Sequence, residues 1–212
     1  MKKTTITGLF ILFTLCLFGQ DWSYDIYHVG EKYPGYIIKN DGTKVEGYLE
    51  AHSRASSSPF SADNQTKVTF FSDPKNKKTK IEYKPEDLKE YMIADKHYVA
   101  MNYSGGLLAK PVRFLLVKKE GRIKTCVWYE VDQTQTQGPT KYIEKEIIQK
   151  GDEKPFESTS LLLGFVKKMS ELVKEYPELA KKITNKEKGY GMLNIENIIA
   201  EYNEWYAKNN NN

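Results

Sequence analysis

The sequence predicts an α+β protein, with an antiparallel β-sheet, barrel-like or strongly bent, followed by a small C-terminal helical bundle. Two observations lead to this class. Up to Lys150, short apolar and aromatic segments are separated by turn residues, and the clearest of them alternates with a period of two. After Gly151, apolar residues recur at steps of three and four, which is the spacing of one helical face.

The first twenty residues predict a secretory signal peptide. Lys2 and Lys3 form a short basic region, and residues 6–18 are nearly all apolar and carry no charge. A segment of this length is too short to cross a bilayer, which takes about 20 helical residues. Small Gly19 and polar Gln20 follow, so we expect cleavage after one of these two residues.

Two alternatives remain for this N-terminal segment. A lipoprotein would be acylated at Cys16, but such sites favour a small residue before the cysteine, and Leu15 stands there. An uncleaved membrane anchor is less favoured still. We therefore expect an exported protein, periplasmic or secreted, with no transmembrane segment after signal cleavage.

Charge and cysteine content restrict the partners and the chemistry. Removal of Lys2 and Lys3 lowers the formal net charge from +4 to +2, so no strong field attracts nucleic acid. Cys126 is then the single cysteine, which excludes an internal disulfide. It alternates within an apolar strand-like segment, so we interpret it as a buried small hydrophobe rather than a reactive thiol.

The stretch GYIIKNDGTKVEGYLE, residues 35–50, predicts the first β-hairpin. Asp41-Gly42 suits a two-residue type I′ turn, because both positions need positive φ. The expected register pairs Ile38 with Val45, Tyr36 with Gly47, and Gly35 with Tyr48. Each tyrosine would then cover a glycine across the strands. A phosphate-binding loop would instead lead into a helix, and here a strand follows.

The same pattern of short apolar and aromatic segments separated by turn residues predicts the remaining strands. They are expected at residues 68–71, 80–83, 91–93, 97–103, 112–117, 123–131 and 142–148. Polar or glycine-containing turns separate them, including residues 73–78, a turn at Glu120-Gly121 and a loop at residues 133–139. We assign residues 21–150 to this β-domain.

Residues 151–208 are predicted to form a helical subdomain, and residues 209–212 a disordered tail. The first helix carries an apolar stripe from Leu161 to Tyr176 and takes Ser158 as its N-cap. Pro177 opens a second helix, and Asn194 caps a third with its own apolar stripe. We expect the helices to pack together and against the sheet. The alternative is an exposed helical stripe that receives a partner.

Three segments resemble a group of uncharacterised exported proteins of Bacteroidetes-type bacteria. These segments are GYIIKNDGTKVEGYL, YKPEDLKEYMI and the helical end YPELAKKI...IENIIAEYNEW. The resemblance spans nearly the whole mature chain, and it implies export and a β-then-α layout. The group brings no assigned catalytic residues, so none is carried over.

No motif for catalysis or metal binding is evident. His28, His52 and His97 lie far apart in sequence, without the spacing of a zinc site, and no nucleophilic serine motif is present. Glu86-Asp87 lies in a turn, where acids commonly accept backbone hydrogen bonds. We therefore assign no catalytic residue, no metal ligand and no cofactor, and binding residues remain unknown.

Two functions from different classes remain. The favoured one is an exported, non-catalytic binding or scaffolding protein of the bacterial cell envelope, whose partner is an envelope protein, peptide or glycan. Its fifteen tyrosines include candidates for a stacking surface. The alternative is a secreted hydrolase whose acids and histidine meet only in the fold. A deep pocket that joins His97 to a carboxylate would favour the hydrolase, and a shallow surface with clustered tyrosines would favour binding.

The N-terminal segment provides the first test. We expect the mature protein to begin at Gln20 or Asp21, because the short apolar segment ends at Phe18 and small Gly19 follows. Intact mass spectrometry of the protein recovered from its producing cells measures this directly. A species that retains Met1, or one acylated at Cys16, would contradict the assignment.

Overall fold

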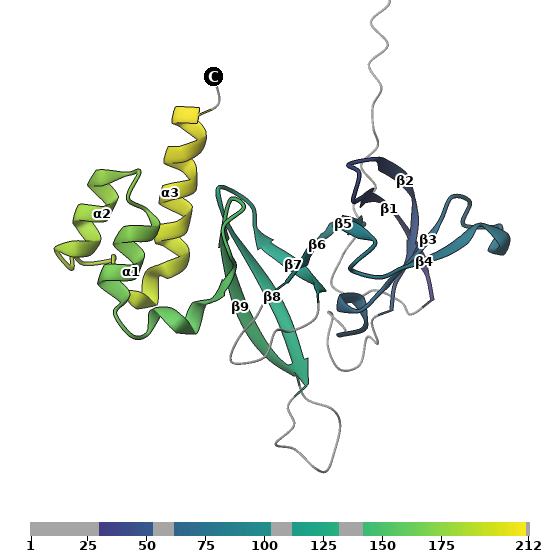
Figure 1. Cartoon of the computed structure of the whole chain (residues 1–212), viewed down its shortest axis with the longest axis horizontal. Coiled ribbons are helices and arrows are strands. Elements are labelled where there is room, and N and C mark those ends of the chain that lie inside the picture. The colour runs from purple at the N-terminus through teal and green to yellow at the C-terminus, as the bar shows by residue number, and fades with distance from the viewer. Residues whose placement is uncertain (1–29, 53–61, 103–111, 132–141, 211–212) are drawn as a thin grey trace, which may run out of the picture.

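The computed structural model describes residues 30–52, 62–102, 112–131 and 142–210. The predicted signal peptide, Cys16 and His28 lie outside this part of the chain. The described residues form a ten-stranded antiparallel sheet, and Figure 1 shows the helices beside one end of it. The strands are β1 (Lys32–Lys39), β2 (Lys44–Glu50), β3 (Val68–Phe71), β4 (Lys80–Tyr83), β5 (Leu88–Ile93), β6 (Lys96–Met101), β7 (Arg113–Lys119), β8 (Ile123–Val131), β9 (Tyr142–Lys150) and β10 (Phe156–Glu157).

The strand order is β10-β9-β8-β7-β6-β5-β1-β2-β3-β4. Strands β1 to β4 form one meander, and β5 returns to the free side of β1 to begin a second meander that ends at β10. The return from Tyr83 to Leu88 covers five peptide steps, which reach at most about 18 Å. In a flat sheet, the four strand spacings from β4 to β5 alone measure about 19 Å. The sheet must therefore bend strongly over β1 to β5.

The α+β class is confirmed, and a barrel is not formed. Strands β4 and β10 are the two edges of the sheet and do not pair with each other. The short β10 also extends the sheet past Lys150, where the sequence placed the end of the β-domain. It pairs Phe156 with Ile148 and Glu157 with Ile147.

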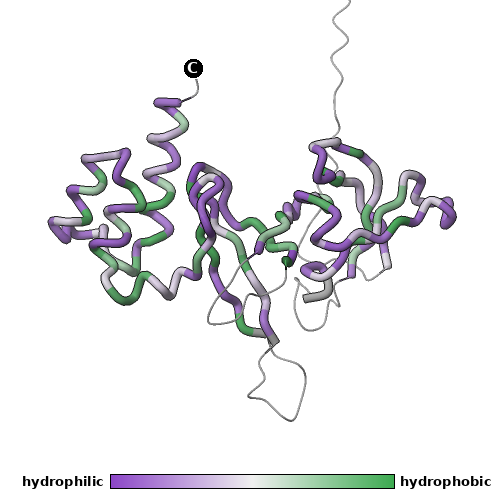
Figure 2. The backbone as a smooth tube through the Cα atoms, viewed as in Figure 1, coloured by the Kyte–Doolittle hydropathy of each residue, from purple (hydrophilic) through white to green (hydrophobic). Residues whose placement is uncertain are grey.

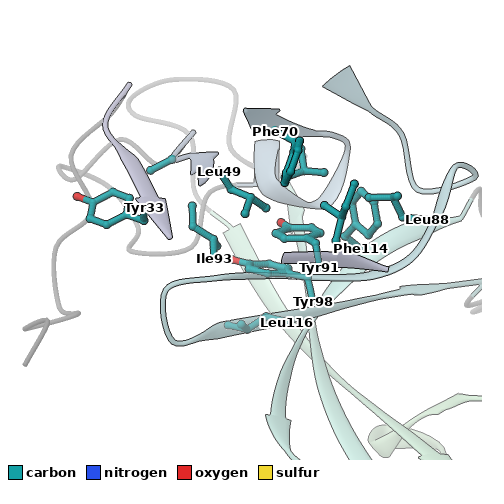
Figure 3. Close-up of a cluster of buried hydrophobic side chains, with 12 residues drawn as sticks. Tyr33, Leu49, Phe70, Leu88, Tyr91, Ile93, Tyr98, Phe114 and Leu116 are labelled. Carbon is teal, nitrogen blue, oxygen red and sulfur yellow. The ribbon is translucent and has the colours of Figure 1, made fainter. Parts of the chain in front are cut away.

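Bending encloses the main core of the β-part. Buried side chains from the bent strands β1 to β5 and from β6 and β7 meet in this core, as Figure 3 shows. Tyr91 stacks on Tyr98 with ring centroids 4.6 Å apart, and the Phe114 ring lies edge-on to Tyr91 at 4.8 Å. The Tyr91 hydroxyl donates a hydrogen bond to the Asn64 carbonyl oxygen. Its polar tip is thus satisfied inside the core.

The helical end has one long helix and two short ones. Its helices are α1 (Phe165–Leu172), α2 (Pro177–Thr184) and α3 (Ile195–Asn210), with 3₁₀ turns η3 (Ser158–Leu161) and η4 (Met192–Asn194) before α1 and α3. The expected first helix from Ser158 is wrong, because Gly164 has φ +83 and interrupts it. Asn209 and Asn210, which were expected in the tail, belong to α3, and residues 211–212 lie outside the described part of the chain.

The helices pack on β8 and β9, as expected. Ile123 and Ile148 of the sheet share one core with Met169 of α1, Leu179 of α2 and Ile199 of α3. All five side chains are at most 1% exposed. Each large apolar side chain buried in this way contributes roughly 1.5–3 kcal/mol. Most of the stripe predicted from helical spacing is therefore core, but Leu162, which that spacing placed in the stripe, is 54% exposed. Figure 2 shows apolar positions along the helices.

A buried lysine fastens the helices to the sheet. The Lys150 side chain is 3% exposed, and its ammonium donates to the Leu172 carbonyl oxygen at 2.6 Å and to Glu175 Oε2 at 2.5 Å. It also lies 5.3 Å from the centre of the Tyr202 ring, and the Tyr202 hydroxyl donates to the same Glu175 oxygen. One ammonium group thus joins β9, the end of α1 and the middle of α3.

The first hairpin differs from its predicted register by one position. Ile37 pairs with Val45, Tyr36 with Glu46, Gly35 with Gly47, and Pro34 with Tyr48. The loop holds three residues instead of two, because the Gly42 amide donates to the Lys39 carbonyl oxygen and the Lys39 amide to the Thr43 carbonyl oxygen. Gly42 has φ +89, as the third residue of such a loop requires. The tyrosine-over-glycine arrangement is therefore wrong.

Gly35 and Gly47 face each other because the core leaves no room for side chains. A Cβ atom on Gly35 would lie 1.9 Å from the Met92 carbonyl oxygen, and one on Gly47 would lie 2.5 Å from the Phe70 ring. Both distances are far below van der Waals contact. The glycine pair lets the bent strands approach closely.

The other strand predictions agree with the structure within a few residues at their ends. Strands 68–71, 80–83 and 123–131 are confirmed with their predicted bounds. Cys126 is fully buried, and this burial raises the pKa of its thiol to about 12. The interpretation of Cys126 as a small hydrophobe is therefore confirmed.

Substitution of Gly42 and of Gly47 compares the cost of backbone strain at positive φ with the cost of steric overlap in the core. Gly42→Ala should lower the free energy of unfolding by about 1 kcal/mol, since positive φ is its main cost and no atom lies within 4 Å of the new Cβ. Gly47→Ala should cost more, because its Cβ meets the Phe70 ring and the Phe71 carbonyl oxygen. Urea unfolding measures both. Equal losses would contradict the account of Gly47.

The Lys150–Glu175 pair predicts a pH-dependent stability. Burial opposes ionisation of Glu175, but hydrogen bonds from Lys150, its own backbone and Tyr202, with the Lys150 charge, together lower its pKa. Its contribution is therefore complete above the unfolded-state pKa of about 4.3 and is lost as pH falls through the lower folded-state pKa. Glu175→Gln should destabilise the protein by about 1–3 kcal/mol at pH 7, with a smaller difference in acid.

Glu171→Gln is the matched control for that measurement. Glu171 pairs with Lys174 in the same region, but both side chains are more than 60% exposed. This substitution should leave the unfolding midpoint in urea unchanged. Equal losses of unfolding free energy for Glu171→Gln and Glu175→Gln would show that the buried position of Lys150 does not strengthen its pair with Glu175.

Candidate functional site

The outer face of the bent sheet carries a row of side chains across four strands. Because directly paired residues share a face, Glu46 of β2, Tyr36 of β1, Met92 of β5 and His97 of β6 form this row. Their neighbours in sequence, such as Ile37, point into the core instead. We call this set the outer row.

A shallow hollow lies over the β1–β2 end of the outer row. It has a volume of about 580 Å³, and its lining includes Tyr36, Glu46, Tyr48 and Met92 around the glycine pair. The exposed Lys44 ammonium lies 4.3 Å from the centre of the Tyr36 ring. Burial and then the nearby Glu90 carboxylate raise the pKa of the Tyr36 hydroxyl. The hollow therefore combines aromatic rings, a thioether and a carboxylate.

Two carboxylates flank His97 at the other end of the outer row. Its Nδ1 lies 2.5 Å from Glu120 Oε1, and its Nε2 lies 3.5 Å from Glu90 Oε1. Lys124 lies 3.9 Å from the second oxygen of Glu120. The His97 side chain is 20% exposed, and its Nε2 is buried without a hydrogen-bond partner among the described residues. His97 of β6 is thus half-buried between Glu90 of β5 and Glu120 of the β7–β8 turn.

A histidine between carboxylates has the parts for general acid–base chemistry, because one acid orients the ring while the other nitrogen exchanges a proton. A substrate must also have a place to bind beside it. His97 lines neither the hollow over the glycine pair nor the two cavities described next. Among the described residues, no group of three His, Cys, Asp or Glu side chains is arranged to hold a metal ion.

Two further cavities lie next to the helices. One, of about 330 Å³, has Phe156, Leu161 and Leu172 in its lining, together with lysines that include Lys168. The other, of about 510 Å³, lies between the sheet and the start of α3, with Glu144 and Lys118 in its lining. Acids and lysines are mixed in both, and neither gathers a recognisable catalytic set.

The structure places the other residues considered in the sequence in structural roles. A ring nitrogen of His52 lies 3.1 Å from the hydroxyl of Thr69 on β3, and β5, β1 and β2 separate β3 from β6, which carries His97. Asp87 accepts a hydrogen bond from the Lys84 amide, as the turn interpretation expected. The lysines of residues 75–78 are exposed at the β3–β4 connection.

Sequence reasoning missed the acids that meet His97. Glu120 is 23 positions from His97 in sequence, and Glu90 is on the neighbouring strand. No local motif links them. The single available signal was the alternation of β5 and β6, which places Glu90 and His97 on one face once the strand pairing is known.

Comparison with known proteins adds no relative. No protein-family model, no curated protein and no solved structure matches this chain. Within the described ranges, no helix has both the length and the apolar character needed to span a bilayer.

Proposed function

We propose that this chain is an exported, non-catalytic binding or scaffolding protein of the bacterial cell envelope, and that the hollow over the glycine pair receives its ligand. The observation that carries this proposal is the open, shallow surface lined by Tyr36 and Tyr48. Shallow aromatic surfaces suit ligands that lie across them, such as a glycan or an extended peptide. Export rests on the N-terminal segment of the sequence, including residues 6–18.

The chemistry of the hollow supports a glycan or a peptide. The face of the Tyr36 ring already attracts the Lys44 ammonium, and this exposed lysine can move aside. A sugar C–H face or a lysine of a peptide then takes the same place. Glu46 and the backbone near Gly35 and Gly47 supply hydrogen-bonding groups at the hollow. This composition supports recognition, and Ser72 in the lining has no histidine beside it there to activate its hydroxyl.

A secreted hydrolase is the second candidate, favoured by the position of His97 between Glu90 and Glu120. In that reading, His97 is the general base and Glu120 orients it. The burial of Nε2, which would have to exchange the proton, and the absence of His97 from the lining of the described cavities favour binding over hydrolysis.

Titration with defined probes tests the binding proposal. The probes are N-acetylglucosamine oligomers and short lysine-containing peptides, followed by amide chemical shifts in nuclear magnetic resonance spectra. We expect one probe class to shift residues around the hollow, and Tyr36→Ala with Tyr48→Ala to weaken that binding about tenfold or more, because stacking surface is lost. Tyr206→Ala is the control, since its half-buried ring lies on α3.

The same proteins separate binding from hydrolysis. Cleavage of the oligomers or peptides that is lost in His97→Ala and Glu120→Gln, and kept in Tyr36→Ala, would support the hydrolase instead. Unshifted resonances around the hollow with both probe classes would overturn the glycan-or-peptide proposal.

A further inference from the structure

Four apolar side chains stand exposed beside the helical end. Leu162 is 54% exposed and Leu163 is 84% exposed, although Leu161 directly before them is 2% exposed in the core. Met192 is 37% exposed and Leu193 is 97% exposed. We call these four residues the apolar tip. Exposure of this degree in large apolar side chains indicates a contact outside the folded chain when the residues are grouped.

The two halves of the apolar tip lie at the same end of the bundle. Lys150 connects Leu172, the last residue of α1, with Tyr202 in the middle of α3. The Tyr176 ring also stacks on Trp205 with centroids 4.8 Å apart. Helices α1 and α3 therefore run in the same direction, and both begin at the opposite end of the bundle (Figure 1). Leu162 and Leu163 precede α1, and Met192 and Leu193 precede α3.

Exposed lysines accompany the apolar tip. Lys167 and Lys168 lie in the first turn of α1, and Lys186 and Lys188 lie in the connection between α2 and α3. Glu187 is the single acid in these two segments, residues 162–168 and 186–193. The segments that present the leucines thus carry a net positive charge. Apolar side chains flanked by lysines match the interface of an anionic bilayer, where acyl chains lie beneath negative headgroups.

The shape of the tip distinguishes a bilayer from a protein partner. A stable protein interface buries about 800 Å² on each side with complementary packing. Four side chains on two short connections offer much less area, and the leucines project from the surface. A fluid bilayer needs no complementary shape. We propose that the apolar tip docks on the surface of an anionic lipid bilayer by inserting Leu163 and Leu193 among the headgroups, with the nearby lysines above them.

Vesicle binding tests this proposal with the protein as its producing cells process it. The probes are vesicles of phosphatidylethanolamine with phosphatidylglycerol, and vesicles of phosphatidylcholine alone. Leu163→Asp with Leu193→Asp should lower the partition coefficient on the anionic vesicles by about tenfold or more. Ile81→Asp is the matched control, because Ile81 is 47% exposed on β4, outside the helical end, and this variant should bind like the parent. Lys167→Glu with Lys188→Glu should weaken binding to the anionic vesicles more than to phosphatidylcholine.

A local probe removes any contribution from the apolar N-terminal segment. Leu193→Trp should show a blue-shifted emission on anionic vesicles and quenching by brominated lipid, relative to Ile81→Trp. Equal quenching of the two tryptophans, or equal vesicle binding by parent and Leu163→Asp with Leu193→Asp, would overturn the proposal. Self-association that these aspartates abolish, without vesicle binding by the parent, would assign the tip to a second copy of the chain instead.

Discussion

The backbone of β8 depends on hydrogen bonds from two side-chain amides, Gln65 and Asn203, which lie far apart in the sequence. Strand β9 pairs with all nine residues of β8, but β7 pairs only with the segment from Thr125 to Val127. Gln65 exchanges two hydrogen bonds with the amide and carbonyl of Tyr129, and Asn203 does the same at Ile123. Each amide thus replaces one residue of a missing strand. Unpaired buried backbone groups here would cost about 1–3 kcal/mol each.

These amides connect the parts of the fold. Gln65 belongs to the turn before β3 and Asn203 to α3, so β8 is bonded both to the N-terminal β-part and to the helical end. The approach of Asn203 also requires Gly121, where a Cβ would lie 2.3 Å from the amide nitrogen. The turn at Glu120-Gly121 is consequently more than a connection. It admits Asn203 and, through Glu120, also positions a partner for His97.

The features that could be predicted from the sequence are those that depend on residues close together in the chain. Alternation located the strands, and helical spacing located the stripe that includes Met169 and Ile199. The first hairpin was off by one position, because Asp-Gly suits both a two-residue loop and the three-residue loop that Gly42 closes. Gly164 was likewise compatible with a helix on spacing alone. The pairs Gln65–Tyr129 and Asn203–Ile123 span 64 and 80 positions, and no local pattern encodes such a separation.

Strand parity explains why the helices leave the candidate site open. Ile123 and Thr125 point to one face of β8, and the helices cover this face at Ile123 and at Ile148 of β9, which pairs with Thr125. Cys126 points to the opposite face and packs with Val99 of β6. His97 lies two positions before Val99 and shares that opposite face. The sheet therefore separates the proposed surfaces. Ligand contact at the outer row and lipid contact at the apolar tip use different faces, so occupation of one need not block the other.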